Sequence, residues 1–170
     1  MTASPIRALG PITPHLWFDS QAEEAATFYT SLFVDSGIDD VSRYTEAGRE
    51  VHGREAGTAM NVRFHLAGQP FLALNGGPLF AFSESVSFLV TCETQEELDT
   101  LWGRLTEGGD PAAQQCGWCK DRFGLSWQVV PAALPRLLGD PDPARAARAL
   151  EAMLKMKKID VWELERAAAA

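Results

Sequence analysis

Residues 22–32 read AEEAATFYTSL, and residues 95–105, which begin 73 positions later, read QEELDTLWGRL. In both segments the apolar side chains recur three and four residues apart, which is the spacing of one face of an α-helix. These side chains are Ala25, Phe28, Tyr29 and Leu32 in the first segment and Leu98, Leu101, Trp102 and Leu105 in the second. A helix repeated in this way predicts a chain built from two similar modules.

Both helices are expected to begin at a capping box, in which a Ser or Thr and a Glu three residues later satisfy the first backbone N–H groups. Ser20 with Glu23 provides this pattern in the first helix. Thr94 with Glu97 provides it in the second, one residue out of step with the repeat. Gly108-Gly109 is expected to end the second helix, because glycine adopts the left-handed conformation that closes a helix.

Strand-like runs flank each helix. Residues 60–66 alternate between apolar and polar side chains, as a half-buried strand does. The other expected strands are 12–18, 38–44 and 70–74 in the first half, and 85–92, 114–121 and 125–130 in the second. From the repeat we expect the order strand, helix, three strands to occur twice, and the runs 114–121 and 125–130 are two of the three strands expected after the second helix. The polar, glycine-containing segment 46–57 is expected to be a mobile loop.

A helical extension is expected after the second module. Asp142 followed by Pro143 is typical of an N-cap and the first position of a helix, and predicts a helix over 144–157. Shorter helices are expected at 131–138 and 159–167. The predicted organisation is a tail at 1–11, a βαβββ module at 12–79, a second at 80–131 and the helical extension at 132–170, together forming one compact domain.

Composition excludes several classes of partner. The chain has 170 residues and a net charge of −8, and an acidic surface repels nucleic acid. No apolar run approaches the roughly 18 residues of a membrane span, and the first residues lack the apolar core of a secretory signal. Three cysteines, an odd number, favour a reducing compartment. We expect a cytoplasmic protein without nucleic-acid or membrane partners.

Several stretches resemble the vicinal oxygen chelate superfamily, which includes glyoxalase I, extradiol dioxygenases and bleomycin-resistance proteins. Within it, the chain is similar to the branch of 3-demethylubiquinone-9 3-methyltransferase-like proteins. The matching stretches are HLWFD at 15–19 with EEA at 23–25 and FY at 28–29, FLALNGGP at 71–78, GWCKDRFGLSWQVVP at 117–131 and MLKMKKID at 153–160. The resemblance implies an α+β fold in which two βαβββ modules form a cup-shaped mixed sheet. It also implies a homodimer that binds a small molecule on the concave face.

The resemblance also implies where a metal would be held, because metal-dependent members take four ligands from the first and last strand of each module. The corresponding positions here are Ile12, Leu72, Ser85 and Gln128. A shift of register by a few residues offers His15, Asn75, Ser87 and Gln128. Neither set contains a carboxylate, and divalent ions are held chiefly by carboxylate, imidazole and thiolate groups. We therefore expect no catalytic metal.

No cofactor is expected either. A nucleotide-type cofactor in an α/β fold needs a glycine-rich turn between a strand and a helix, where the backbone can approach the ligand. The two strand-to-helix turns, residues 19–21 and 93–95, contain no glycine. Gly76-Gly77 follows a strand but precedes Pro78 and no helix. Cys116 and Cys119 have the Cys-x-x-Cys spacing of a redox dithiol or half of a zinc site. They lie in a predicted strand, where positions three apart face opposite sides of the sheet, so we expect neither kind of site.

The residues expected to contact a ligand are His15, Trp17, Arg63, His65, Asn75, Trp118, Ser126 and Gln128. Gln128 is the strongest single candidate, because an amide in an otherwise apolar strand needs a hydrogen-bond partner if it is buried. His15 could instead be structural, the tryptophans could simply pack in the core, and Arg63 and His65 could face solvent or a partner subunit. No catalytic residue is assigned, because no nucleophile-and-base pair is visible in the spacing.

Taken together, these features predict a small-molecule-binding protein without a catalytic metal and with no assigned reaction. One alternative is an enzyme of the same superfamily, either a metal-dependent lyase or isomerase or the methyltransferase. Another is a resistance protein that sequesters an aromatic or antibiotic-like compound. A homodimer is expected because open strand edges need partners.

Overall fold

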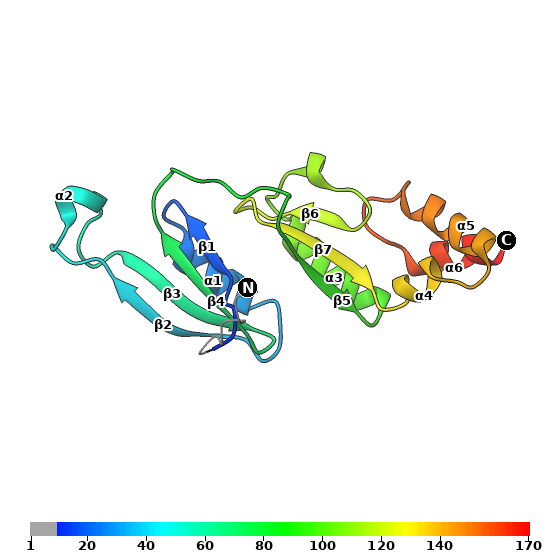
Figure 1. Ribbon diagram of the computed structural model, residues 1–170, viewed down its shortest axis with the longest axis horizontal. Helices are drawn as coiled ribbons and strands as arrows, with labels where there is room; N and C mark the ends of the chain where they lie inside the picture. Colours follow the sequence, from blue (N-terminus) through cyan, green and yellow to red (C-terminus); the bar gives the residue numbers. More distant parts are fainter. Residues whose placement is uncertain (1–9) are drawn as a thin grey trace, which may run out of the picture. The chain divides into compact units, whose positions relative to one another are not determined.

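The computed structural model describes residues 10–170, which form two compact units that divide between Ala81 and Phe82 (Figure 1). Each unit combines helices with one mixed sheet, so the α+β fold class is confirmed. The division lies close to the predicted module boundary after residue 79. The finer boundaries, and the assembly of the units into one domain, stay predictions. Residues 1–9 of the predicted tail lie outside the described part of the chain.

The first unit contains a complete βαβββ module. Its elements are β1 (His15–Phe18), α1 (Ala22–Thr30), β2 (Gly37–Arg43), α2 (Arg49–His52), β3 (Ala59–Leu66) and β4 (Gln69–Asn75). The strands lie in the order β1-β4-β3-β2, with β1 parallel to β4 and the other neighbours antiparallel. The sequence predicted all four strands to within a few residues.

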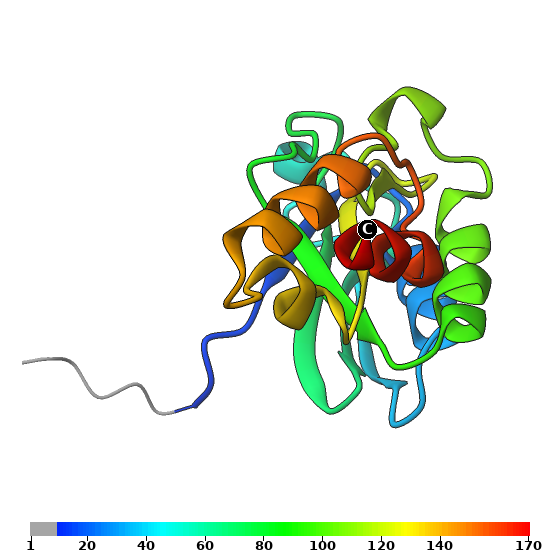
Figure 2. The ribbon, with the colours of Figure 1, turned by 90° about the vertical axis from the view of Figure 1, so that its right-hand side faces the viewer.

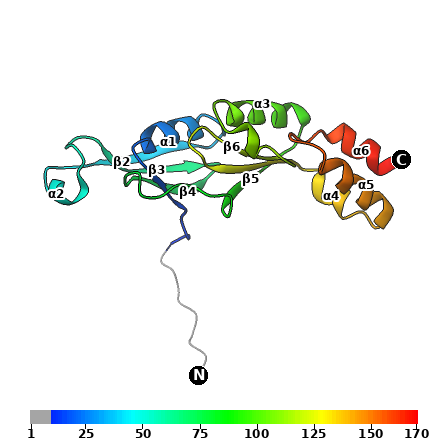
Figure 3. The ribbon, with the colours of Figure 1, turned by 90° about the horizontal axis from the view of Figure 1, so that it is seen from above.

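Alternation along the strands decides which face of the first sheet is buried. Val62, Phe64 and Leu66 on β3 are buried, as are Phe71 and Ala73 on β4. Helix α1 packs on β3 and β4 and covers this face (Figure 3). The polar side chains of β3 therefore point to the opposite face, as the period of two requires.

The capping box predicted from Ser20 and Glu23 is wrong. Helix α1 begins at Ala22, its N-cap is Gln21, and the Gln21 side chain accepts no hydrogen bond from the first turn of the helix. Ser20 stands one position too early to reach the first turn. The backbone N–H of Ala22 instead donates to Oδ1 of Asn75 at 2.8 Å, so the last residue of β4 caps the helix.

Helix α2 lies within the segment that the sequence predicts to be a mobile loop. It is a single turn, Arg49–His52, between two glycines. The ring of His52 packs on Tyr44, with 4.6 Å between the ring centroids. A short helix in this segment was not predicted, because four residues are too few to show helical periodicity.

The second unit repeats the arrangement with one strand fewer. Its elements are β5 (Ser87–Cys92), α3 (Gln95–Thr106), the 3₁₀ turn η1 (Pro111–Ala113), β6 (Trp118–Lys120) and β7 (Ser126–Pro131). The strand order is β5-β7-β6, with β5 parallel to β7 and β6 antiparallel to it. The predicted capping box of Thr94 and Glu97 is confirmed. Helix α3 ends just before Gly108, whose φ is +73°.

The third strand after the second helix is therefore missing from this unit, which corrects the prediction of two complete βαβββ modules. The connection between α3 and β6 contains Gly108, Gly109 and Pro111, and Pro111 begins the 3₁₀ turn. Glycine and proline disfavour a paired strand, because glycine gains no side-chain packing and proline lacks the N–H that a ladder needs. Local chemistry here overrides the symmetry of the repeat.

The C-terminal extension is helical, as predicted, and lies at one end of the second unit (Figure 1); Figure 2 looks onto its helices from that end. It comprises α4 (Leu134–Leu138), α5 (Pro143–Met153) and α6 (Val161–Ala169). The predicted cap is confirmed, because Oδ1 of Asp142 accepts a hydrogen bond from the N–H of Ala144 at 2.9 Å. No helix in residues 10–170 is long and apolar enough to cross a membrane.

Backbone hydrogen bonds attach the extension to the sheet. The N–H groups of Cys116 and Gly117 donate to the carbonyls of Met156 and Lys157, each at 2.8 Å. The side chain of Gln95, at the start of α3, donates to the carbonyl of Ile159. The connection between α5 and α6 thereby covers part of the backbone next to β6, where the second unit has one strand fewer than the first.

Candidate functional site

Four of the predicted site residues share one face of the first sheet, the face that α1 leaves uncovered (the α1-distal face). His15 on β1 pairs in register with Leu72 on β4, which in turn lies opposite Arg63 on β3. Trp17 occupies the same face two residues along β1. Neighbouring strands are about 4.8 Å apart, so His15 and Arg63 flank Leu72 at roughly 10 Å from one another.

Trp17 is held in a fixed orientation on this face. Its Nε1–H donates to the carbonyl of Gly77 at 2.8 Å, and its ring meets the edge of Phe80 with 5.0 Å between centroids. A Cβ atom placed on Gly76 would stand 2.2 Å from the Trp17 ring, so only glycine fits beneath the indole. The Gly-Gly pair therefore serves to seat an aromatic ring, and the ring and Phe80 offer a flat apolar surface.

The polar residues of the α1-distal face differ in their partners. His15 and Arg63 are exposed, so His15 is not a buried structural histidine. His65 is half-buried, and its Nδ1 lies 2.9 Å from Oδ1 of Asp39, an ion pair when the imidazole is protonated. Arg63 and His15 are thus the groups on this face best placed to meet a polar ligand.

Asn75 was also predicted to bind ligand, but its contacts serve the fold. It is 6% exposed. Its Oδ1 accepts from the Ala22 N–H, and its Nδ2 donates to the carbonyl of Ala59 at 3.0 Å. Its own carbonyl accepts the hydroxyl hydrogen of Tyr44 at 2.7 Å. Asn75 therefore connects β4, β3, α1 and the end of β2.

The three remaining predicted residues share the corresponding face of the second sheet, away from α3 (the α3-distal face). Two rows cross it. Ser87 pairs in register with Ser126, which lies opposite Lys120; Leu89 pairs with Gln128, which lies opposite Trp118. The buried residues Trp127, Val129 and Cys119 point to the other face, which packs on α3.

Polar side chains on the α3-distal face are connected to one another. Gln128 donates from Nε2 to Oγ of Ser87 at 2.9 Å, so this half-buried amide has the partner that its place in an apolar strand requires. Lys120 forms an ion pair with Glu84, with 2.5 Å between Nζ and Oε1. A hydrogen bond from Lys120 lowers the pKa of the Glu84 carboxyl, so Glu84 is ionised at neutral pH. The Ser126 hydroxyl is buried and has no hydrogen-bond partner in the described part of the chain.

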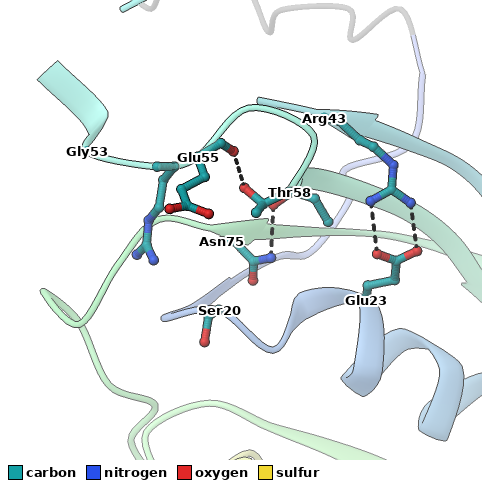
Figure 4. Close-up of a pocket in the computed structure, with 9 residues that line it drawn as sticks. Ser20, Glu23, Arg43, Gly53, Glu55, Thr58 and Asn75 are labelled. Carbon is teal, nitrogen blue, oxygen red and sulfur yellow. Dashed lines mark hydrogen bonds and ion pairs between the residues drawn. The ribbon is translucent and has the colours of Figure 1, made fainter. Parts of the chain in front are cut away.

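A surface pocket lies close to these residues in each unit. A pocket of about 470 Å³ in the second unit, which we call the Trp118 pocket, is lined by Glu84, Ala112, Ala113, Gln115, Cys116 and Trp118. A more polar pocket of about 440 Å³ lies in the first unit at the start of α1 (Figure 4). Both volumes lie in the range of small-molecule sites.

Charges in the polar pocket of the first unit are largely paired. Glu23 and Arg43 form an ion pair at 3.1 Å at one end of the pocket, while Ser20, Glu55 and Asn75 line the other end (Figure 4). Arg54 also lines the pocket, and it forms an ion pair at 3.1 Å with Asp19, which lies outside the lining. Because both arginines already have carboxylate partners, the pocket has little positive charge to offer a ligand.

The donor atoms of both faces do not fit a divalent metal ion. No group of three His, Cys, Asp or Glu side chains within residues 10–170 could hold one. In the first unit the neighbour of His15 across the sheet is Leu72, which has no donor atom. In the second unit the Gln128 amide donates to Ser87, and two neutral groups bind a divalent ion weakly.

The N-termini of α1 and α3, the helices that follow β1 and β5, both have side-chain caps. The Ala22 N–H at the start of α1 is taken by Asn75. The start of α3 is closed by the capping box of Thr94 and Glu97. Since a nucleotide-type site depends on unpaired N–H groups at such a terminus, the residues present do not fit this class of cofactor.

The Cys-x-x-Cys segment does not form a reactive dithiol site. Cys119 is buried on the α3 side of the sheet, and burial, reinforced by the charge of Asp121, raises its pKa to about 12. Cys116 lies in a turn before β6. A thiol must ionise to attack or to bind a metal, so Cys119 is unsuited to either role.

Sequence reasoning missed Lys120 and Glu84 as neighbours of the predicted residues. Lys120 lies two positions after Trp118, so strand alternation alone could have placed it on the same face. Glu84 lies before β5 and reaches Lys120 only through the tertiary fold.

Comparison with known proteins agrees with the fold described above. The sequence model of the 3-demethylubiquinone-9 3-methyltransferase family matches residues 10–130. The PhnB protein of Bacillus cereus is 38% identical over 72% of this chain and all of its own, with a TM-score of 0.62. No curated protein matches the chain.

Two more distant structures share the fold alone. Protein PA1353 of Pseudomonas aeruginosa is 20% identical over 71% of this chain and 96% of its own, with a TM-score of 0.52. The fosfomycin resistance protein FosX of Listeria monocytogenes, solved with Mn(II) and sulfate, is 13% identical over 78% of this chain and 98% of its own, with a TM-score of 0.50.

Proposed function

Because the chain belongs to the 3-demethylubiquinone-9 3-methyltransferase family of the vicinal oxygen chelate superfamily, we propose that it binds a small molecule on the helix-free faces of its sheets, without a bound metal. We further propose that it works in the cytoplasm as a homodimer. The reaction, if the bound molecule undergoes one, is not assigned.

One observation carries this proposal. Seven of the eight residues predicted to contact a ligand lie on the two sheet faces that α1 and α3 leave uncovered. The eighth, Asn75, is used to hold the fold together. In a small domain, one face of a sheet is covered by a helix to form the core. Aromatic and polar side chains gathered on the other face are those of a binding surface.

The side chains on these faces suit a flat organic molecule. Trp17, braced by Gly77 and Phe80, offers an aromatic surface, and stacking on such a ring favours planar apolar groups. Arg63 and His15 can donate hydrogen bonds beside it, and Gln128 can do so in the second unit. This composition, a few polar groups around apolar surface, is typical of small-molecule sites.

Metal-dependent lyase or isomerase chemistry and methyl transfer are weaker candidates. Both need groups that the described residues do not supply, namely carboxylate or imidazole ligands that converge on one point, or an open strand-to-helix turn for a cofactor. One fold hosts many chemistries, so likeness of fold leaves the chemistry of this chain open.

The proposal is tested with three probes of one shape, namely 1-naphthoate, naphthalene-1-carboxamide and 1-naphthylmethylammonium. Titration calorimetry and tryptophan emission are measured on the full chain, with and without EDTA. We expect at least one probe to bind with a dissociation constant below about 1 mM, unchanged by EDTA. Trp17→Phe or Trp118→Phe should weaken that binding at least fivefold.

Trp162→Phe is the matched control, because Trp162 is 73% exposed on α6 and lies on neither face. It should change the affinity less than twofold. Failure of all three probes to bind, or an equal effect of all three tryptophan variants, would refute the proposal. Loss of binding in EDTA together with a stoichiometric metal in the purified protein would favour the metal-dependent alternative.

A further inference from the structure

Three polar side chains form a row across the α3-distal face of the second sheet. Ser87 on β5, Ser126 on β7 and Lys120 on β6 are register partners in turn. Residues directly opposite in an antiparallel pair have Cα atoms about 4.5–5.5 Å apart. The Lys120 ammonium and the Ser126 hydroxyl can therefore reach the same small group.

Ser126 is the unexplained member of this row. It is 1% exposed, yet its hydroxyl has no hydrogen-bond partner among residues 10–170. Buried hydroxyls in folded proteins nearly always have a partner, and a hydroxyl left without one points to a group that binds there.

The Ser87 hydroxyl can also donate a hydrogen bond. Its Oγ accepts a hydrogen bond from Nε2 of Gln128 at 2.9 Å, which leaves its own O–H free to donate elsewhere. Gln128 thus orients the Ser87 hydroxyl as a donor. The row consequently presents two hydroxyl donors and one ammonium, a set that suits an oxyanion.

Glu84 occupies the position that such an oxyanion would take on Lys120. The Glu84 side chain is 64% exposed, whereas that of Lys120 is 21% exposed. Because Glu84 is the exposed member of the pair, water can solvate its carboxylate once it leaves Lys120, and Glu84 can be displaced by another carboxylate. The contact of the Glu84 carboxylate with Lys120 shows that a carboxylate can bind the ammonium group at this point.

The Trp118 pocket begins beside this row. Glu84 and Trp118 both line it, together with the methyl groups of Ala112 and Ala113. Trp118 and Lys120 are two residues apart on one strand, which places them on the same face about 7 Å apart. An apolar group in the pocket would therefore lie next to a carboxylate held by Lys120.

We propose that the Trp118 pocket binds a carboxylate carried on a flat apolar body. The carboxylate displaces Glu84 from Lys120 and accepts hydrogen bonds from Ser126 and Ser87, while the apolar body lies against Trp118. This inference rests on the proposed function, of which it names the ligand class and the residues in the second unit. A single negative charge matches the single cation of the row, whereas a dianion would leave one charge without a partner.

The test compares 1-naphthoate with naphthalene-1-carboxamide, which has the same shape and no charge, by titration calorimetry of the full chain at pH 7. We expect naphthoate to bind at least tenfold more tightly. Lys120→Met should weaken naphthoate binding at least tenfold and leave carboxamide binding within twofold. Lys155→Met, which removes the same charge from an exposed position on the extension, is the control and should change neither.

Two further variants keep the test decisive if Lys120→Met folds poorly. Ser126→Ala should weaken naphthoate binding about fivefold. Glu84→Gln, on an exposed side chain, should strengthen it severalfold because Lys120 then has no competing carboxylate. Equal binding of the two probes, or weaker naphthoate binding to Glu84→Gln, would overturn the inference.

The two proposals fail in different ways. If the carboxamide binds as tightly as naphthoate and responds to Trp17→Phe, the ligand class proposed for the second unit is wrong, while small-molecule binding stands. If none of the naphthalene probes binds, small-molecule binding itself is refuted.

Discussion

Replacing Asn75 by alanine should destabilise the first unit by about 3 kcal/mol, although Asn75 was predicted from the sequence to bind ligand. The substitution removes the acceptor for the Ala22 N–H at 2.8 Å and the donor to the Ala59 carbonyl at 3.0 Å. Loss of a helix cap costs about 1 kcal/mol. A buried carbonyl left without its partner costs about 1–3 kcal/mol more.

Urea denaturation followed by circular dichroism measures this change, with hydrogen exchange of the α1 amides as a local readout. Asn61→Ala is the matched control, since Asn61 lies on β3 of the same sheet and no hydrogen bond from its side chain contributes to the cap of α1. Its cost should stay below about 1 kcal/mol, the range of most substitutions that leave no buried group unpaired.

Asn75→Asp separates the two hydrogen bonds. It retains an oxygen facing the Ala22 N–H, and a negative charge is favourable at a helix N-terminus. It also replaces the donor to Ala59 by a second oxygen, which repels that carbonyl. We expect protection of the α1 amides to persist while the unit is still destabilised. If Asn75→Ala lay within about 0.5 kcal/mol of the unsubstituted protein, or matched Asn61→Ala, the structural role assigned to Asn75 would be wrong.

Three further outcomes are expected. Gly76→Ala should lower the free energy of unfolding by about 1–3 kcal/mol through overpacking, because the new Cβ would stand 2.2 Å from the Trp17 ring. Near-UV circular dichroism should show the indole displaced. An unchanged spectrum and an unchanged stability would contradict this. Asp121→Ala should lower the free energy of unfolding, measured by heat or urea, by about 3–5 kcal/mol. The backbone N–H groups of Phe123 and Leu125 and the indole N–H of Trp127 would then lose their acceptor. Asp110→Ala, which removes one exposed cap, is the control and should cost about 1 kcal/mol. The free energy of unfolding should fall as pH rises from about 9 towards 12. The reason is that the Cys119 thiol ionises near pH 9.0 in the unfolded chain, whereas burial raises its pKa in the folded protein to about 12. A Cys119→Ala variant with the same alkaline slope would refute this.

Much of the fold could be predicted because its signals are local. Apolar spacing placed α1 and α3, and alternation along β3 was enough to assign Arg63 and His65 to the face opposite Val62 and Phe64. The period of two in a strand makes the face of a residue a property of its neighbours in the chain. The same reasoning placed the Thr94 capping box, which needs only residues three positions apart.

Symmetry between the halves was a less reliable guide than local chemistry. The repeat predicted a third strand after α3, but Gly108, Gly109 and Pro111 stand in that connection and form a turn instead. The Ser20 cap failed for a similar reason, since a shift of one residue puts its hydroxyl out of reach of the first turn. Hydrogen bonds depend on single positions, whereas a repeat is recognised from an average over many.

Contacts between residues far apart in the chain were beyond any pattern in the sequence. The Asn75 oxygen that caps α1 acts across 53 positions, and the bond between Gln128 and Ser87 spans 41. The support that Asn75 gives to α1 and the meeting of Lys120 and Ser126 on one face follow from strand order and register, and Glu84 reaches Lys120 from the segment before β5. Those depend on how whole strands align across the sheet, and no short segment carries that information. Residue spacing along the chain therefore sufficed to identify helices, strands and their faces, while strand pairing alone brought the chemical groups of each face together.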